Sequence, residues 1–367
     1  MKVYSKMQES GLFCTFVNNN FDEMEEIRSR IVKKGIKTLM PLIIGIAVLW
    51  LLYKDINLNE LWEIIKSANF YIIAFSLLFG LAGNIFRALR WELTIQSLGY
   101  YPKRMSLIYA VMGNYAVNFL LPRAGEVWRS GVITKYDKVP LSATFGTLIV
   151  DRFFDVVAML FILLLCFALD FNFFISYFNS NPAVGSGLIA TFSSFWFYAT
   201  IIAVSLLLYL LFRFLPNFYL LKKIKLFYRG IKQDILMVRK MKQKGLFVFY
   251  TLLCWFGYYL YFYFCFYAFG FTEHLGPVAG LLVFAMSSLG VAAPTQGGIG
   301  AWHFMVITSL LVYGVSYEQG SAFAGAVFTI QSVWLILIGI FSIFAIQYVK
   351  RDLPETTQTS NTESNDN

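Results

Sequence analysis

Long apolar segments separated by short polar ones dominate the chain. A helix needs about 20 predominantly apolar residues to cross the hydrocarbon core of a bilayer. Segments close to or above this length predict transmembrane helices over residues 36–53, 70–89, 145–169, 195–214, 246–269 and 321–349. The pattern therefore predicts an all-α protein with about six full membrane spans.

Three further apolar segments, 105–121, 278–293 and 301–315, flank two breaks in the pattern. The first break is NYAVNFLLPRAGEVWR, residues 114–129, and the second is PTQGGIGAWH, residues 294–303. A helix ends at a proline such as Pro122 because proline has no N–H and its ring clashes with the preceding turn. Broken backbone is tolerated at membrane depth only where protein or a water-filled cavity covers it. We therefore predict a polar site at these breaks.

The positions of lysine and arginine predict that the first break is a hairpin. Cytoplasmic loops are enriched in these residues, and they occur on both sides of the segment 105–121, at Arg87, Arg90, Lys103 and Arg104 before it and at Arg129, Lys135 and Lys138 after it. If both flanks are cytoplasmic, the chain must enter the membrane and return. Residues 105–134 are therefore predicted to form a re-entrant hairpin.

Basic flanks also constrain the second break: if both flanks are cytoplasmic, the chain must cross the membrane an even number of times between them, which we call the parity rule. Residues 245–349 contain no lysine or arginine, whereas basic residues stand on both sides of this stretch. Segments 278–293 and 301–315 therefore either cross as a pair or enter from outside and return. We favour re-entry, since a cytoplasmic turn would usually carry a basic residue. Two hairpins from opposite faces would be typical of an inverted-repeat transporter.

Composition supports a multi-pass membrane protein. Of 367 residues, 58% are hydrophobic and 14% are charged, against roughly 25% charged in soluble domains. The net charge of +9 comes from basic residues beside apolar segments, so we expect no nucleic-acid binding. Cys14, Cys166, Cys254 and Cys265 have no paired spacing. We expect no metal, no cofactor and no catalytic residue, and the oligomeric state stays open.

Polar segments divide the chain into a tail, a membrane domain and a second tail. Residues 1–35 are expected to be a basic, disordered cytoplasmic tail, 36–350 the membrane domain, and 351–367 a disordered tail, so both termini would be cytoplasmic. Within the domain, residues 222–244 carry nine basic residues and one acid. Apolar residues at helical spacing there predict an amphipathic surface helix that attracts anionic lipid; an ordinary basic loop is the alternative.

Charged residues near the first break are candidates for binding an anionic head group. Arg87 lies deeper in its predicted span than Arg90, which we expect to reach the interface by extending its side chain. A guanidinium donates two parallel hydrogen bonds to phosphate oxygens. Arg123, Glu126 and Arg129 would share one face of a helix that resumes after Pro122, where free N–H groups also attract anions.

Six other positions have both a functional and a structural interpretation. Arg152 and Asp155 can pair at a spacing of three, either within the site or as a structural ion pair. The glycines in the second break allow unusual backbone conformations and the close approach of a ligand. Close packing between helices is the structural alternative for these residues, which are Gly297, Gly298 and Gly300. His303 is either a satisfied interior histidine or a titratable member of the site.

The motifs together resemble a known family. RALRW (87–91), NFLLPRAGEVWR (118–129), VDRFFD (150–155) and PTQGGIG (294–300) are similar to those of the lysylphosphatidylglycerol synthase transmembrane family, which includes the flippase domain of the multiple peptide resistance factor. The resemblance covers about residues 36–350 and adds Asn118 to the candidates. Many relatives have glutamate at the position of His303. The resemblance implies a bacterial inner-membrane protein that moves or holds a lipid with a charged or glycosylated head group.

The expected function is therefore that of a flippase for a phospholipid or lipid-linked sugar with a phosphate-bearing head group. The predicted substrate-binding set is Arg87, Asn118, Arg123, Glu126, Arg129, Arg152, Asp155, Gly297, Gly298, Gly300 and His303. Only 17 residues follow Lys350, so we expect no aminoacyl-transfer domain and no enzyme activity. Alternatives are an accessory subunit that works with a lipid-modifying enzyme, and a structural scaffold.

Overall fold

The described part of the chain is helical and contains no strand. A computed structural model describes residues 58–121, 124–182, 241–293 and 295–349, with isolated residues between 50 and 206. The elements in these ranges are α3 (Leu58–Lys66), α4 (Phe70–Gln96), α5 (Arg104–Leu120), α6 (Ala124–Asp137), α7 (Leu141–Leu169), α8 (Phe171–Ser180), α12 (Lys244–Tyr263), η1 (Phe264–Ala268), α13 (Pro277–Ala292), η2 (Gln296–Gly298), α14 (Ala301–Val312), α15 (Tyr317–Ala345) and η3 (Ile346–Tyr348).

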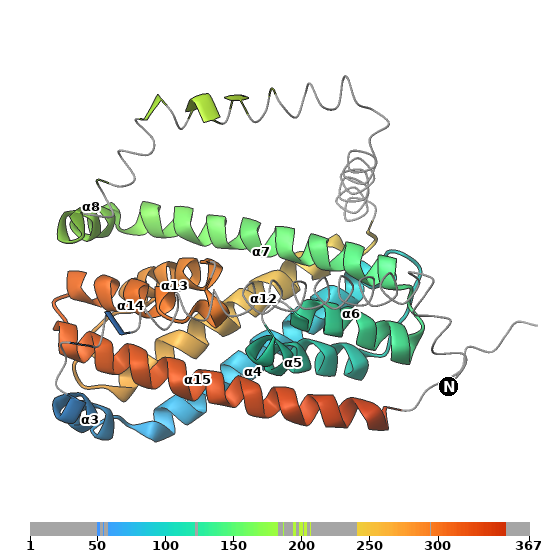
Figure 1. Ribbon diagram of the computed structural model, residues 1–367, viewed down its shortest axis with the longest axis horizontal. Helices are drawn as coiled ribbons and strands as arrows, with labels where there is room; N and C mark the ends of the chain where they lie inside the picture. The colour runs from blue at the N-terminus through green and yellow to red at the C-terminus, as the bar shows by residue number, and fades with distance from the viewer. Residues whose placement is uncertain are drawn as a thin grey trace, which may run out of the picture.

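Four of these helices are long and apolar enough to cross a membrane. They are α4, α7, α12 extended by η1, and α15 extended by η3, and they coincide with the predicted spans 70–89, 145–169, 246–269 and 321–349. Helices α7 and α15 run along opposite long edges of the bundle, and α4 and α12 lie between them (Figure 1). The predicted spans 36–53 and 195–214, most of the surface segment 222–244, and both predicted tails lie outside the described residues.

The two breaks each separate a pair of short helices that pack on each other. α5 and α6 stand on either side of the first break, and α13 and α14 on either side of the second. The α5–α6 pair fills one end of the bundle and the α13–α14 pair fills the opposite end (Figure 1). Helix α5 also contacts η2 within the second break, so the two pairs meet.

Two hydrophobic clusters show which ends of the helices lie together. One cluster joins the end of α4 to the start of α5, the end of α6 and the start of α7, through Ile95, Leu107, Ile133 and Leu148. The other joins the start of α4 to η1, the start of α13, the end of α14 and the start of α15; its members include Ile73, Phe266, Ala279, Leu310 and Phe323. Each short pair therefore begins and ends at one end of the bundle, as the parity rule predicted.

The two ends differ in charge. We call the first the basic end, because its helix termini and connections carry Lys103, Arg104, Lys135, Lys138, Lys242 and Lys244. At the opposite end, which we call the far end, the described charged residues beside the helix termini are Lys66, Glu63, Asp170, Glu273 and Glu318. Basic residues thus gather at the end where α5 begins and α6 ends.

Local sequence signals set several helix boundaries. Asn69 accepts a hydrogen bond from the N–H of Tyr71 and begins α4, and Asp170 accepts one from Phe173 and begins α8. Ser316 and Gln319 form a reciprocal capping box at the start of α15. Such side chains pair the N–H groups that a helix leaves open in its first turn.

Glycines shape the second break and the helix pair around it. Gly297, Gly298 and Gly300 have φ values of 63°, 82° and 80°, a left-handed conformation that glycine adopts without steric cost. Close packing occurs instead at Gly290, near the end of α13, where an added Cβ would lie 2.7 Å from the Cα of Trp302. Gly290 therefore brings α13 and α14 into backbone contact, while the three turn glycines bend the chain.

We predict that Gly290→Ala destabilises the protein, because the added methyl group meets backbone atoms of α14. Overpacking of this kind costs about 1–3 kcal/mol. Gly131→Ala is the control: it also lies in a helix, but its added Cβ would meet no described atom within 4 Å beyond its own helix backbone, so replacing glycine there should stabilise by about 0.5–1 kcal/mol. Thermal unfolding in detergent checks both. Shifts of the same sign would contradict the close approach of α13 and α14.

We also predict that cysteines flanking one short helix pair are labelled from the same side of the membrane. In a variant without native cysteines, Tyr101→Cys and Lys135→Cys flank α5–α6, and Glu273→Cys and Ser316→Cys flank α13–α14. A membrane-impermeant maleimide should reach the first two from one face and the other two from the opposite face. Labelling of Tyr101→Cys and Lys135→Cys from opposite faces would show that α5 or α6 crosses fully.

Candidate functional site

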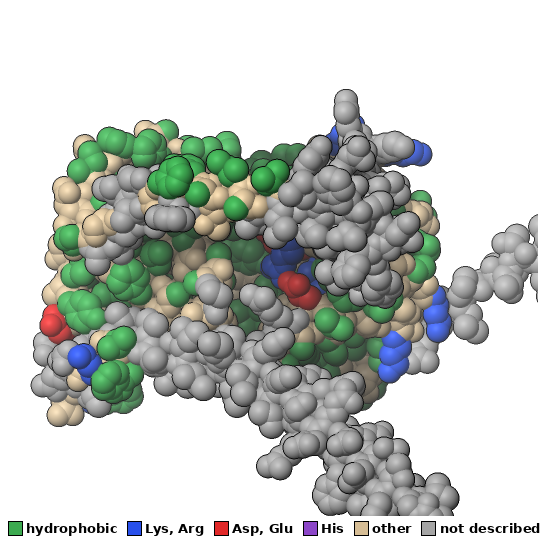
Figure 2. All heavy atoms as spheres, turned by 45° about the horizontal axis from the view of Figure 1, so that its top comes forward, with side chains coloured by type: hydrophobic (Ala, Val, Ile, Leu, Met, Phe, Trp, Pro, Cys, Tyr) green, Lys and Arg blue, Asp and Glu red, His purple; other side chains and the backbone are tan. Residues whose placement is uncertain are grey.

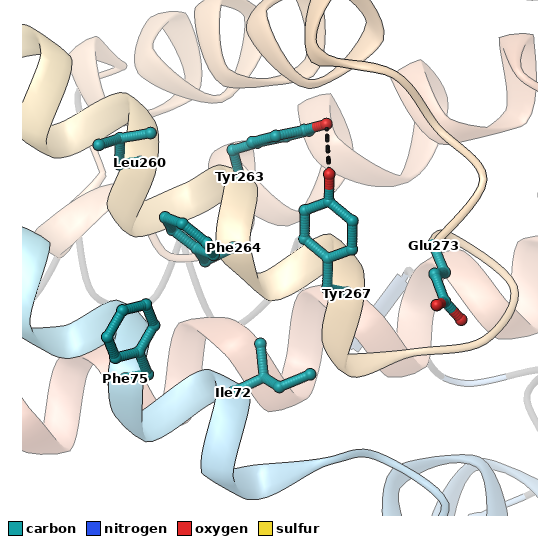
Figure 3. A pocket seen from close by; sticks show the side chains of 7 residues that line it. All are labelled: Ile72, Phe75, Leu260, Tyr263, Phe264, Tyr267 and Glu273. Atoms are coloured by element: carbon teal, nitrogen blue, oxygen red, sulfur yellow. Dashed lines mark hydrogen bonds between the residues drawn. The ribbon is translucent and has the colours of Figure 1, made fainter.

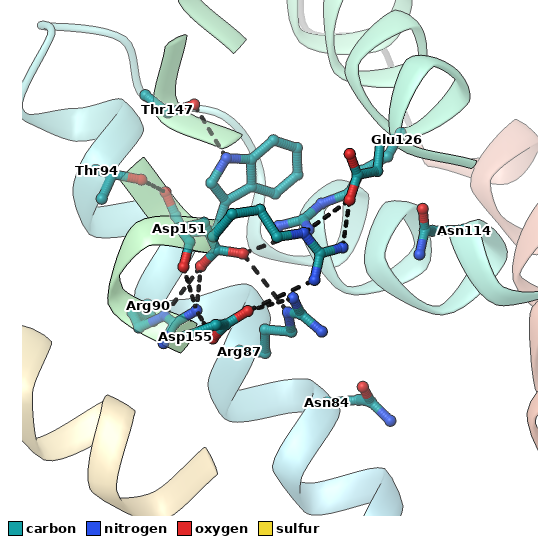
Figure 4. Close-up of polar contacts among 12 residues, drawn as sticks. Asn84, Arg87, Arg90, Thr94, Asn114, Glu126, Thr147, Asp151 and Asp155 are labelled. Atoms are coloured by element: carbon teal, nitrogen blue, oxygen red, sulfur yellow. Dashed lines mark hydrogen bonds and ion pairs between the residues drawn. The ribbon is translucent and has the colours of Figure 1, made fainter. Parts of the chain in front are cut away.

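Charged side chains from three helices gather between the helices of the bundle (Figure 4). On α4 and α6 the members lie three residues apart, and on α7 Asp155 lies four residues from Asp151 and three from Arg152, so each of these pairs shares one face of its helix. We call this set the charged network; its members are Arg87 and Arg90 from α4, Glu126 and Arg129 from α6, and Asp151, Arg152 and Asp155 from α7.

Arg90 forms the buried centre of the charged network. Its Nε lies 3.0 Å from Oδ1 of Asp151, and its Nη2 contacts Oδ1 of Asp151 and lies 2.7 Å from Oδ1 of Asp155. The side chain is fully buried. The expectation that Arg90 extends to the membrane interface is therefore wrong. Two aspartates on α7 pair with the guanidinium of Arg90 inside the bundle, so this side chain does not need to extend to water.

Arg87 is also paired, and it links the charges to a group of neutral hydrogen bonds. Its Nη2 lies 2.7 Å from Oδ2 of Asp155, and its Nη1 lies 3.5 Å from the hydroxyl of Tyr115. That hydroxyl and the hydroxyl of Tyr258 both donate to Oδ1 of Asn84, at 2.7 and 2.8 Å. Arg87 therefore holds α4, α5 and α7 together in the described structure.

Arg129 is buried with part of its hydrogen-bonding capacity unused. Its guanidinium carbon lies 3.7 Å from the ring centroid of Trp91, whose Nε1 donates to Oγ1 of Thr147 at 3.0 Å. One nitrogen, Nη1, lies 3.6 Å from Oδ2 of Asp151. Nε and Nη2 are buried without a hydrogen-bond partner among the described residues. Buried donors of this kind are unfavourable unless an acceptor reaches them.

Arg152 and Glu126 form the outer edge of the charged network. Nε and Nη2 of Arg152 both contact Oε1 of Glu126, at 2.7 and 2.5 Å. The predicted pair of Arg152 with Asp155 is present but longer, at 3.6 Å. The two outer side chains are 43% and 38% exposed, against 1% for Asp151. Acidic and basic side chains are visible together in the hollowed middle of a largely hydrophobic face (Figure 2).

Two asparagines position the start of α6. Asn118 Oδ1 accepts a hydrogen bond from the N–H of Gly125 at 2.8 Å, and its Nδ2 donates to Oδ1 of Asn114 at 3.3 Å. A Cβ on Gly125 would collide with the Asn114 carbonyl oxygen. Because a helix that begins after a break has open N–H groups, Asn118 satisfies one of them. Its side chain thereby fixes where Glu126 and Arg129 lie.

The remaining candidates lie apart from these contacts or outside the described residues. Arg123 belongs to the latter group. Gly297, Gly298 and Gly300 lie in the second break, whose η2 segment contacts α5. His303 is buried, and its ring packs 4.6 Å from that of Phe328 and 5.5 Å from that of Trp302, between ring centroids. The described contacts thus place His303 in an aromatic environment.

Comparison with known proteins agrees with this arrangement. The profile of a family described as "Lysylphosphatidylglycerol synthase TM region" matches residues 38–339, which include both breaks and the whole charged network. The chain belongs to this family. It is therefore a multi-pass membrane protein, consistent with its four long apolar helices.

One curated relative of this family member is a UPF0104 membrane protein of Methanocaldococcus jannaschii. It is 22% identical over 128 residues, which are 34% of this chain and 38% of the relative. The match thus spans little more than a third of the relative's length. No solved structure matches the chain.

A second candidate site in this family member is a cavity of about 520 Å³ at the far end. Its lining comes from the start of α4 and from α12, η1 and the connection after them, and comprises Ile72, Phe75, Leu260, Tyr263, Phe264, Tyr267 and Glu273 (Figure 3). The hydroxyls of Tyr263 and Tyr267 lie 3.0 Å apart. Its described lining has no basic side chain, so it is less suited to a phosphate than the charged network.

Sequence reasoning missed two members of the charged network, Arg90 and Asp151. A signal for both was present, since Asp151 precedes Arg152 inside an otherwise apolar segment and Arg90 follows Arg87 by three residues. An ionised side chain at membrane depth requires a partner. Treating every such charge as one half of a pair would have marked Arg90 and Asp151 as paired residues inside the bundle, without naming the partner of either.

We predict that Asp151→Asn strongly destabilises the protein, because it leaves the surrounding arginines without their shared anion. Removing one partner of a buried ion pair typically costs about 3–5 kcal/mol. Glu63→Gln is the control, since Glu63 pairs with Lys66 at the surface and such pairs contribute about 0–1 kcal/mol. Thermal unfolding in detergent measures both variants. A similar small shift for both would mean that Asp151 does not hold the arginines.

Proposed function

We propose that this protein translocates a lipid with a phosphate-bearing head group across the bacterial inner membrane. The observation that carries the proposal is the charged network itself, which lies between membrane-length helices and is partly exposed at Arg152 and Glu126. Guanidinium groups recognise phosphate through paired, charge-assisted hydrogen bonds. A lipid head group is the phosphate that a site inside a membrane bundle meets most directly.

The cost of the charged network argues that it is more than a structural feature. An ionised side chain in the middle of a membrane helix costs at least about 2.5–3.5 kcal/mol on the insertion scale. Buried ion pairs can often be replaced by well-packed apolar residues without loss of stability. A bundle that only had to be stable could therefore use leucine or phenylalanine at these positions, so retained charges favour a role in binding.

The two short helix pairs support movement of the head group between leaflets. They begin at opposite ends of the bundle, and α5 contacts η2 where they meet. A transporter binds its substrate near the midplane at such interrupted helices and opens toward each side in turn. We propose that the basic end is cytoplasmic, because lysine and arginine mark cytoplasmic connections, and that both chain ends lie in the cytoplasm.

We predict that the purified protein in liposomes accelerates dithionite quenching of a fluorescent phospholipid in the inner leaflet, and that Arg152→Gln lowers the added rate at least about tenfold. The loss of a charge-assisted contact with phosphate has about this effect. Arg104→Gln is the control, since Arg104 forms a comparable pair with Glu92 at 3.0 Å on the basic end.

Equal quenching rates with and without protein would contradict translocation. Binding of the lipid without movement would instead favour the accessory role beside a lipid-modifying enzyme. If Arg152→Gln transports as fast as the unmodified protein, the head group does not pass through the charged network.

A further inference from the structure

We infer that Glu126 is a displaceable internal ligand, whose carboxylate occupies the place on Arg152 that a monoanionic phosphodiester of a lipid head group takes on binding. The inference deepens the proposed function and rests on the same site. It assigns Glu126 a role in specificity, because only a group that competes with a carboxylate can enter.

The contact between Arg152 and Glu126 already has the form of an anion complex. Nε and Nη2 of Arg152 form the edge of the guanidinium that donates two parallel hydrogen bonds. Both donors contact a single oxygen, Oε1 of Glu126, at 2.7 and 2.5 Å. A phosphodiester has two unesterified oxygens and can give one to each donor. The phosphodiester therefore matches the guanidinium edge better than the carboxylate does in this arrangement.

Exposure makes this pair the one that can exchange. The side chains of Arg152 and Glu126 are 43% and 38% exposed, Asp155 is 18% exposed, and Asp151 and Arg129 are each 1% exposed. Ion pairs that water reaches contribute little stability, whereas opening a buried pair leaves a charge without solvent. The outer pair can therefore open while the inner pairs of Arg90 and Arg87 stay closed.

Unused donors lie behind the outer pair. Arg129 lies three residues after Glu126, about one turn further along the same face of α6. Its buried Nε and Nη2 have no hydrogen-bond partner among the described residues. Stacking on Trp91 holds the guanidinium in place. An anion that displaces Glu126 thus approaches donors that a carboxylate fixed to α6 leaves unpaired.

Charge selects the kind of phosphate. The charged network has four arginines and three acids, so its formal charge among the described residues is 4 − 3 = +1. One monoanion makes the network neutral, whereas a doubly charged phosphomonoester leaves an excess negative charge. The displaced carboxylate remains in the first turn of α6, where the helix dipole stabilises it. The site should therefore prefer a phosphodiester.

The test measures binding of dioctanoyl phosphatidylglycerol to the full chain in uncharged detergent micelles by calorimetry. Glu126→Gln should tighten binding about fivefold, because it removes the competing charge. Arg152→Gln should weaken binding about tenfold. In the double variant the gain from Glu126→Gln should disappear, since both effects act through one guanidinium. Glu92→Gln, which alters the Arg104 pair instead, should leave binding unchanged.

Unchanged or weaker binding by folded Glu126→Gln would overturn the inference. If that variant does not fold, Glu126→Asp replaces it, because the shorter side chain draws back from Arg152 and should tighten binding in the same way. Dioctanoyl phosphatidic acid in its doubly charged form should bind more weakly than the phosphodiester, and equal or tighter binding would overturn the charge argument. A gain seen only with inorganic phosphate would overturn the assignment to a lipid head group.

Transport separates this inference from the proposed function. If Glu126→Gln binds the lipid more tightly but the protein does not accelerate lipid movement, the role of Glu126 as a displaceable ligand is supported. The proposed translocation is then contradicted. Normal transport together with unchanged binding by Glu126→Gln would sustain the translocase and overturn the displaceable ligand.

Discussion

The pairing of Arg90 on α4 with Asp151 and Asp155 on α7 is the contact on which the rest of the site depends. In a medium of low dielectric constant an unpaired charge is very unfavourable, so α4 and α7 are constrained to the register that brings these groups together. Arg129 then joins from α6 through Asp151 and Trp91. Once α6 is fixed in this way, Glu126 necessarily faces Arg152 at the outer edge.

The helices are held together differently at the ends of the bundle and in its middle. Buried apolar clusters join the helix termini at both ends, while charges join α4, α6 and α7 between them. Lipid tails are as apolar as leucine, so membrane helices associate through close packing and polar contacts. Here a Cβ on Gly257 would lie 3.0 Å from the Cα of Gly83, and one on Gly339 would lie 2.7 Å from the Cβ of Ala116. Small residues thus let α12 approach α4, and α15 approach α5.

The sequence predicted the parts of this structure that local pattern controls. Hydrophobic length identified four of the long helices, Pro122 located the interruption between α5 and α6, and the left-handed glycines of the second break were recognised as a bend. Depth in the predicted span identified Arg87 as a candidate, but the same reasoning assigned Arg90 to the interface. The partner of Arg90 lies 61 residues away, and periodicity within one helix carries no information about which other helix it meets.

The charged network needs two kinds of contact if it both fixes helices and exchanges a ligand: buried pairs that stay closed and exposed pairs that can open. Its inner and outer members differ in exposure in this way. The inner pairs are buried, so opening them would leave a charge without its partner, and they hold the helices in place. The outer pair is exposed at 43% and 38%, so its partners can separate more readily than the buried pairs. The inner aspartates already pair with Arg90 and Arg87, so an entering anion finds its binding capacity mainly in the exposed Arg152 and in the unused donors of Arg129. The buried inner pairs and the exposed Arg152–Glu126 pair therefore come from the same three helices. Breaking the inner pairs would also remove the outer pair, because the inner contact of Arg129 with Asp151 helps to hold α6 against α7.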